Sequence, residues 1–172
     1  MNLKQDSHMH NETGFDEMRF VRQIRYHRFG AMGQQKLSKA HAAIVGCGAL
    51  GSTTAMSLTR AGIGRLTIID RDVPEWSNLP RQFLFTEKDV CDGFPKAIIA
   101  EKRLKEIDSN VHVIPHVRDL TAHNISDLLS SVDVIVDGTD NFETRFLVND
   151  FSCRENIPWV YGGVIGAEGR VM

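Results

Sequence analysis

The 172-residue chain lacks the features that mark several specialised classes of protein. No apolar run approaches the roughly 20 residues needed to cross a bilayer, so no membrane-spanning helix is expected. The polar start of the chain has no signal-peptide core, and residues 1–17 are predicted to form a disordered leader on a cytoplasmic protein. A net charge of -2 gives no reason to expect nucleic acid or a membrane surface as a partner.

Cysteine is scarce as well. The chain has three cysteines, which are widely spaced and odd in number, and it has no C-x-x-C pair. This pattern favours reduced thiols over a disulfide framework and offers no zinc site. The remaining composition, with 42% hydrophobic and 24% charged residues, is ordinary for a globular protein. One domain is therefore expected, covering residues 18–172.

The chain is organised around residues 42–70, where an apolar run suited to a buried parallel strand opens the segment. Gly46, Gly48 and Gly51 follow as G-x-G-x-x-G, which allows a tight turn, backbone approach to a phosphate and close packing of helix on strand. A second apolar run ends at Asp70, placed to accept hydrogen bonds from ribose hydroxyls. The segment favours a nucleotide site, and a turn that only packs helix on sheet remains the alternative.

Apolar runs and helical patterns alternate through the rest of the chain. Further strands are expected at 111–114, 132–136 and 159–161, with glycines leading toward a sixth, and helices at 95–108, 121–130 and 142–155. This alternation predicts an α/β fold, a Rossmann-like doubly wound and mainly parallel sheet with helices on both faces.

Three segments carry residues suited to the phosphates of a nucleotide. Asn78 and Arg81 are three apart, so one turn can aim an amide and a guanidinium at the same place; alternatively, Asn78 caps the turn and Arg81 pairs with a surface acid. Lys96 lies in a first helical turn, which suits a nearby anion or a solvent-screened surface lysine. Asp140 follows the fourth strand and is either a magnesium ligand or the cap of the next helix.

Arginines also recur every three residues near the start, at Arg19, Arg22, Arg25 and Arg28. This spacing predicts one cationic face on a short helix. The face is either solvated or an arm that delivers arginine to an anion.

Six motifs in this order resemble the ThiF/MoeB/HesA family, bacterial relatives of the ubiquitin-activating enzymes. They are R-F-x-R-Q at 19–23, G-x-G-x-x-G at 46–51, Asp70, S-N-L-x-R-Q at 77–82, P-K at 95–96 and T-D-N at 139–141. The resemblance covers nearly everything after the leader. The amino-acid sequence of residues 70–82 resembles the family members of thiamin biosynthesis more closely than those of molybdenum-cofactor biosynthesis.

The resemblance implies an enzyme, an ATP-dependent adenylyltransferase that releases pyrophosphate. Its substrate would be the C-terminal glycine carboxylate of a small ubiquitin-like sulfur carrier, ThiS-like or, as the next choice, MoaD-like. The positions that match the family's ATP site are Gly46, Gly48, Ala49, Gly51, Asp70, Ser77, Asn78, Arg81, Lys96, Asp140 and Asn141. Those that match its catalytic residues are Arg22, Arg81, Lys96 and Asp140, with Asp140 as the Mg2+ ligand and Arg22 supplied by the other subunit of a homodimer.

The sequence also departs from the family pattern. Ala49 replaces a frequent glycine, and the zinc-binding C-x-x-C pairs, sulfur-transfer cysteine and crossover loop of family members are absent up to Met172. The chain is therefore expected to be a fragment or to lack these functions, with Zn2+ only in a longer natural chain. Two other functions remain open: an NAD-dependent oxidoreductase, which the glycine turn and Asp70 alone would suit, and a non-catalytic nucleotide-binding protein.

Overall fold

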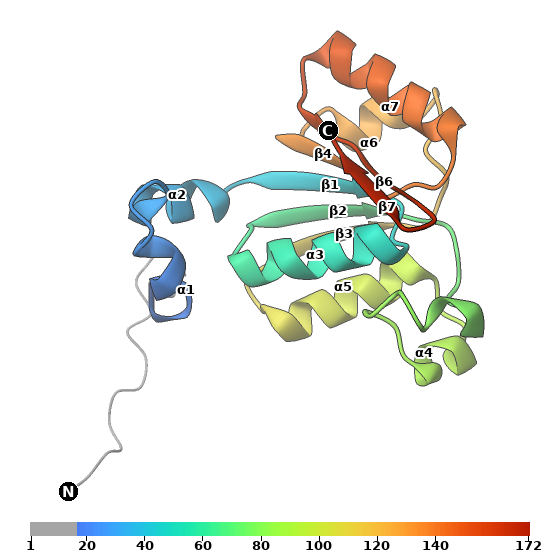
Figure 1. The fold of residues 1–172 in the computed structure, drawn as a ribbon, viewed down its shortest axis with the longest axis horizontal. Coiled ribbons are helices and arrows are strands. Elements are labelled where there is room, and N and C mark those ends of the chain that lie inside the picture. Colours follow the sequence, from blue (N-terminus) through green and yellow to red (C-terminus); the bar gives the residue numbers. More distant parts are fainter. Residues whose placement is uncertain (1–16) are drawn as a thin grey trace, which may run out of the picture.

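A five-stranded parallel sheet forms the centre of the structure (Figure 1), a computed structural model that describes residues 17–172. The predicted leader lies outside these residues, apart from Glu17 at the start of α1. The strands are ordered β3-β2-β1-β4-β5, and every neighbouring pair is parallel. Their bounds are β1 His41–Val45, β2 Arg65–Ile69, β3 His112–His116, β4 Val134–Asp137 and β5 Trp159–Val160.

Helices cover both faces of this sheet. The helices are α1 Glu17–Ile24, α2 Gly30–Leu37, α3 Ala49–Ala61, α4 Glu87–Asp92, α5 Lys96–Ile107, α6 Ile125–Leu129 and α7 Phe142–Glu155, with a 3-10 turn at Trp76–Asn78. Buried side chains of α3 and α5 pack with one face of the strands, and those of α6 and α7 with the other. Within β1, Ala42 and Ile44 belong to the first core and Ala43 and Val45 to the second. The predicted doubly wound α/β fold is confirmed.

Among residues 17–172, no helix combines the length and apolar character that crossing a bilayer requires. The longest of them, α7, has 14 residues and a largely polar sequence.

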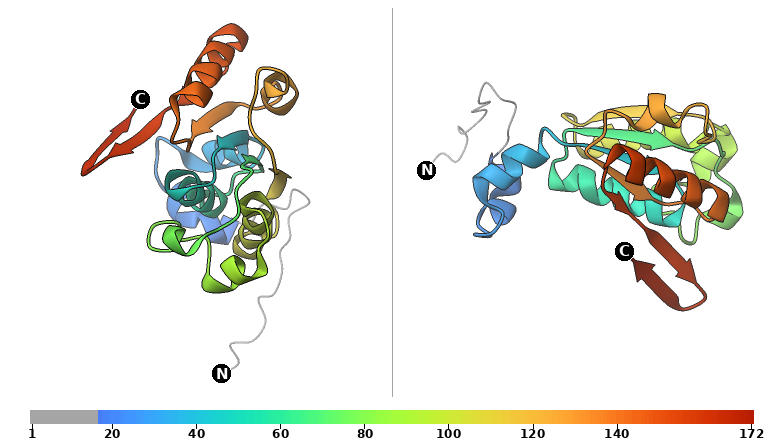
Figure 2. Two further views of the ribbon diagram at one scale, coloured as in Figure 1. Left: turned by 90° about the vertical axis from the view of Figure 1, so that its right-hand side faces the viewer. Right: turned by 90° about the horizontal axis from the view of Figure 1, so that it is seen from above.

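The predicted sixth strand does not join the parallel sheet. Residues Gly162–Ile165 form β6, which pairs antiparallel with β7, Glu168–Val171, in a sheet of its own. The reason is a two-residue turn in which Gly166 has a φ of 60°, a conformation that folds the chain back as a hairpin. This hairpin stands out from the body of the molecule (Figure 2).

The predicted arginine-rich helix face is also wrong. Helix α1 ends at Ile24, so Arg25 and Arg28 lie beyond it. The N–H of Tyr26 donates to the carbonyl of Gln23, and this tighter turn leads into α2. Only Arg19 and Arg22 remain on the helix.

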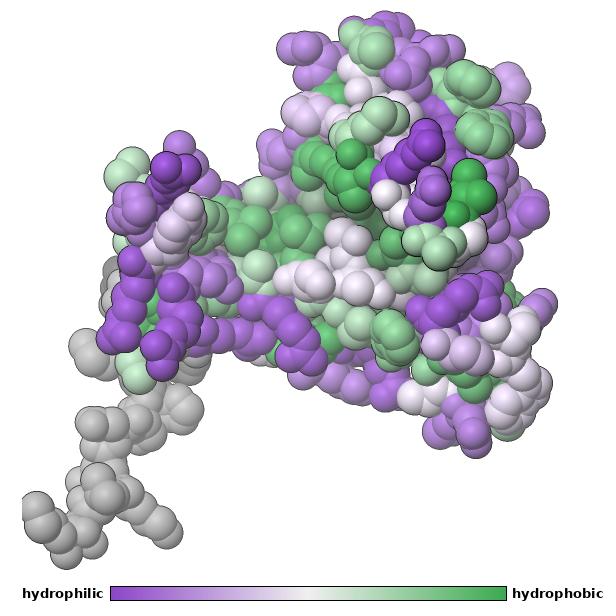
Figure 3. All heavy atoms as spheres, viewed as in Figure 1, coloured by the Kyte–Doolittle hydropathy of each residue, from purple (hydrophilic) through white to green (hydrophobic). Residues whose placement is uncertain are grey.

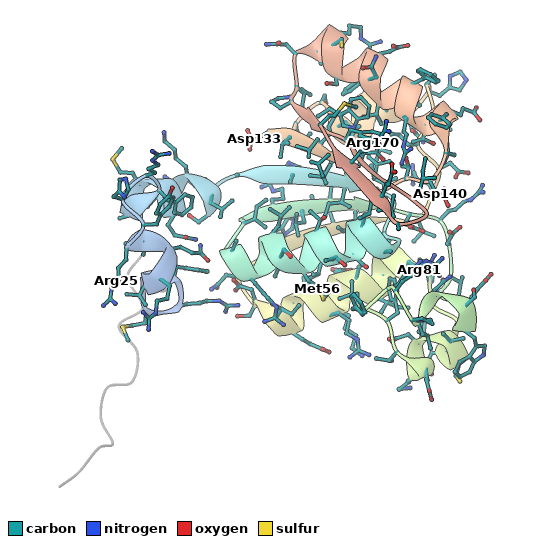
Figure 4. The ribbon with its side chains drawn as sticks, in the orientation of Figure 1. Arg25, Met56, Arg81, Asp133, Asp140 and Arg170 are labelled. Atoms are coloured by element: carbon teal, nitrogen blue, oxygen red, sulfur yellow. The ribbon has the colours of Figure 1, made fainter. Side chains whose placement is uncertain are left out.

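All five strands run in one direction, so the loops that follow them gather at the carboxyl edge of the sheet. Figure 4 shows Arg81 and Asp140 at this edge and Arg25 and Asp133 at the opposite one. The carboxyl edge is therefore the place to look for a ligand site.

Candidate functional site

The glycine turn lies at the centre of this edge, between β1 and α3. Gly46 has a φ of 87°, which favours glycine, and a Cβ on Gly51 would lie 1.8 Å from the Gly46 carbonyl oxygen. The turn also lies against Gly138, which follows β4. Gly48 precedes Ala49, the first residue of α3, and offers no capping side chain. The first N–H groups of α3 are thus available to an anion.

Asp70 lies directly against this turn, as predicted. One carboxylate oxygen accepts from the Cys47 N–H at 2.6 Å, and the other accepts from the Asp72 N–H at 2.7 Å. Burial raises the pKa of Asp70, and these two hydrogen bonds partly offset that rise. Each oxygen keeps a free lone pair, so a ligand with hydroxyl donors would further favour the ionised form.

The thiol of Cys47 is fully buried inside the turn. Its pKa is raised to about 12, first by burial and then by the neighbouring Asp70.

The other two cysteines, Cys91 and Cys153, are exposed. Because the thiolate is the reactive form, we expect iodoacetamide near neutral pH to modify Cys91 and Cys153 and to spare Cys47 until the protein unfolds. Intact-mass spectrometry with and without urea would measure this, and rapid labelling of Cys47 in the native protein would contradict it.

A cavity of about 300 Å³ opens beside the turn and contains two of the predicted phosphate ligands. Its lining residues are Asp72, Val73, Pro74, Glu75, Asn78 and Lys96. Lys96 is only 5% exposed, and its Nζ lies 3.4 Å from Asp72 Oδ2. A solvent-screened surface lysine is therefore the wrong interpretation, since this amine is buried against the cavity. Asp72 and Glu75 were missed from sequence, where no spacing distinguished them from other surface acids.

Asn78 and Arg81 lie on the same short segment but differ in their contacts. Asn78 Oδ1 accepts from the Glu75 N–H at 3.1 Å, so the capping interpretation is confirmed. Arg81 is exposed, and its Nη1 donates to the Ser77 carbonyl at 2.7 Å. Within residues 17–172, Arg81 forms no ion pair with an acid, so that alternative is wrong.

The loop after β4 places Asp140 at the same edge. The cap of α7 is Asn141, whose Oδ1 accepts from the Thr144 N–H at 2.9 Å, so the alternative that Asp140 is this cap is wrong. Asp140 is exposed. No group of three acidic, histidine or cysteine side chains suited to a metal occurs in the described part of the chain. A single carboxylate suits magnesium, which takes its other ligands from water and substrate phosphates.

Asn141→Ala is expected to lower the free energy of unfolding by about 1 kcal/mol, since the first turn of α7 loses its cap. Asn149→Ala in the middle of the same helix is the control, and it should cost nothing because alanine is the better helix former. Urea unfolding of both variants would measure the difference. Equal stabilities would show that the Asn141 side chain does not contribute as a cap.

Sequence reasoning missed Arg145 of α7, whose side chain contacts the loop after β4. Its Nη2 donates to the carbonyls of Thr139 at 2.6 Å and Gly162 at 3.2 Å. Its Nε lies 3.3 Å from Asp137 Oδ2, an ion pair without hydrogen-bond alignment, and its guanidinium lies 4.8 Å from the centre of the Tyr161 ring. One arginine in a mixed polar helix gives no signal in the sequence that would have identified it.

Arg22 is the predicted site residue that the fold keeps apart from the others. Helix α1 is fixed at the amino edge, where Arg19 Nη2 donates to the Ile107 carbonyl at 2.6 Å and Gln23 Nε2 donates to the Ala61 carbonyl at 3.0 Å. Arg22 is exposed on this fixed helix. Figure 1 shows α1 at the end of the sheet opposite the loop between β1 and α3, where the glycine turn lies. Within one chain it cannot join the site.

Comparison with known proteins identifies the family of the chain. Residues 20–172 match the ThiF family. The chain belongs to the ThiF family. Within it, the chain is 50% identical over 151 residues to the sulfur carrier protein ThiS adenylyltransferase of Bacillus subtilis, covering 88% of this chain and 45% of that protein. It is 38% identical over 156 residues to the adenylyltransferase and sulfurtransferase MOCS3 of Danio rerio, covering 91% of this chain and 34% of that protein.

Solved structures of ThiF-like proteins share the fold. The tRNA N6-threonylcarbamoyladenosine dehydratase TcdA of E. coli, solved in complex with ATP, aligns with a TM-score of 0.79 and 27% identity over 91% of this chain and 64% of that one. This ThiF-family chain thus spans less than half the length of the two curated relatives above.

Proposed function

We propose that the chain is the ATP-binding part of an adenylyltransferase that activates the C-terminal carboxylate of a small ubiquitin-like sulfur carrier. The 50% identity to a ThiS adenylyltransferase makes a ThiS-like carrier the first choice, and the similarity to MOCS3 keeps a MoaD-like carrier as the second. The observation that carries the proposal is the cavity beside the glycine turn, which Asn78 and the buried Lys96 both line.

The reaction needs positioning and positive charge more than it needs a base. A C-terminal carboxylate has a reference pKa of about 3.3–3.7, so it is already ionised at neutral pH. Its oxygen forms a bond to the α-phosphorus of ATP, and the bond from that phosphorus to pyrophosphate breaks, with the electron pair leaving on pyrophosphate. Negative charge therefore grows on the phosphate oxygens.

Residues around the turn are suited to each part of the nucleotide. Asp70 would accept from the ribose hydroxyls, and the first N–H groups of α3 would hold phosphate oxygens. Lys96 and Arg81 would stabilise the charge that develops, once their present partners Asp72 and Ser77 release them. Magnesium bound with ATP would neutralise further charge, and Asp140 would be its protein ligand.

A homodimer would account for Arg22. Its exposed place on a fixed helix suits contact with a second copy, whose site would receive the guanidinium. Hydrophobic residues gather in the middle of one face, between α2 and the β6–β7 hairpin (Figure 3), and Val164 and Ile165 of this hairpin are 60% and 82% exposed. Exposed apolar surface of this kind is what an interface between two copies would bury.

Carrier-dependent exchange of labelled pyrophosphate into ATP tests the proposal directly. We expect exchange with a ThiS-like carrier and none with the same carrier lacking its terminal glycine. The oxidoreductase alternative predicts that NAD, and not ATP, raises the melting temperature of the chain. The non-catalytic alternative predicts binding of ATP and carrier without exchange, and either result would overturn the proposal.

A further inference from the structure

Gln82 has a buried carboxamide that the site as described leaves without a role. The residue is 4% exposed, and neither its Oε1 nor its Nε2 has a hydrogen-bond partner among residues 17–172. The backbone around it is fixed, because its N–H donates to the Asn78 carbonyl at 2.9 Å and its carbonyl accepts from the Phe85 N–H at 3.1 Å. Buried side-chain polar groups are nearly always paired, so an unpaired carboxamide in a fixed segment indicates a missing partner, and for its Nε2 that partner is a hydrogen-bond acceptor.

The carboxamide lies beside the glycine turn. A Cβ built on Gly48 would lie 3.7 Å from Gln82 Nε2, so no side chain separates this nitrogen from the turn. Gly48 immediately precedes α3, whose first N–H groups have no capping side chain. The segment after β2 thus places one more N–H donor beside the start of α3, whose first N–H groups are also donors.

We infer that Gln82 binds the nucleotide directly, with its Nε2 donating to a phosphate oxygen held at the glycine turn. The inference rests on the proposed function and adds to it a ligand residue at the same site. A neutral donor suits this place, because it stabilises the phosphate without an ionic partner that would have to be released first. A purely structural role would require the carboxamide to be paired within the protein, and it is not.

Gln82→Met tests the inference, because methionine has nearly the same shape and no hydrogen-bonding amide. A buried polar atom without a partner costs the fold free energy, so the ligand-free variant should melt at or above the wild-type temperature. Its affinity for ATP should fall by about ten- to a hundredfold, the effect of losing one hydrogen bond to a charged group. Gln82→Glu should bind ATP more weakly still, because its carboxylate repels the phosphates.

Gln34→Met is the matched control. Gln34 is fully buried at the opposite edge of the sheet, and both ends of its carboxamide are paired: Nε2 donates to the Ala61 carbonyl at 2.8 Å, and Oε1 accepts from Gln23 at 2.7 Å. This variant should melt below the wild type and, while folded, bind ATP normally. The two buried glutamines are therefore expected to show opposite effects.

Isothermal titration with ATP, AMP and adenosine completes the test. A phosphate contact predicts that Gln82→Met loses affinity for ATP and AMP and keeps the wild-type affinity for adenosine. Wild-type affinity of Gln82→Met for ATP would overturn the inference alone, as would equal losses for all three ligands. A wild-type chain that binds none of the three would overturn the proposed function and this inference with it.

Discussion

Replacing Arg145 with alanine is expected to lower the free energy of unfolding by about 3–5 kcal/mol. The side chain of Asp137 is 1% exposed and that of Arg145 is 13% exposed, so truncating the arginine leaves a buried carboxylate without its cation. The carbonyls of Thr139 and Gly162 lose a donor at the same time. Urea unfolding monitored by circular dichroism would measure the change.

Two further variants separate charge loss from helix effects. Arg154→Ala removes an exposed ion pair with Glu155 from the same helix and should cost at most about 1 kcal/mol. Asp137→Asn combined with Arg145→Ala should recover part of the loss, because no buried charge then remains unpaired. If Arg145→Ala proved as stable as Arg154→Ala, the buried pair would not stabilise the loop after β4.

Replacing Arg81 with alanine is expected to slow carrier-dependent pyrophosphate exchange by about a hundredfold or more. Loss of one preorganised donor at developing negative charge typically costs on the order of 3 kcal/mol. The guanidinium is exposed and held only by the Ser77 carbonyl, so the fold should not depend on it. We therefore expect the melting temperature without ligand to stay within about a degree of the wild type, given the small effects of most surface substitutions.

Arg65→Ala is the matched control for this experiment. Arg65 is also exposed but begins β2 at the amino edge, so its loss removes the same charge far from the glycine turn. Both variants would be assayed for exchange at saturating and limiting ATP. An unchanged exchange rate in Arg81→Ala, or an equal loss in Arg65→Ala, would remove Arg81 from the proposed mechanism.

The central part of the fold was predictable because its signals are local. Apolar runs gave β1 and β2, and the three glycines between them gave the turn. The place of Asp70 followed from the end of its strand. The burial of Lys96 did not follow, since the sequence suited a surface residue equally well, and only packing of the segment after β2 covers it.

Other features depend on contacts between distant segments and could not be predicted. The role of Arg145 requires Asp137 and Gly162, which come from different strands, β4 and β6. The bounds of α7 were predicted correctly, but both Asp140 and Asn141 are good caps, and the structure uses Asn141, the residue directly before Phe142. The hairpin after β5 was predicted to be a sixth strand of the main sheet, because its several glycines do not indicate that the chain turns at Gly166.

The attachment of α1 has a practical consequence for work with this protein. The helix donates to carbonyls at the last residues of both α3 and α5, groups that have no partner inside their own helices. Its Phe20 is buried against Gly62, where α3 ends. An expression boundary placed after Ile24 would therefore remove the donor to the end of α5, leave Gln34 as the remaining side-chain donor to the Ala61 carbonyl of α3, and open a hole where Phe20 packs on Gly62. Shortened versions for crystallisation should retain the chain from Glu17 onward.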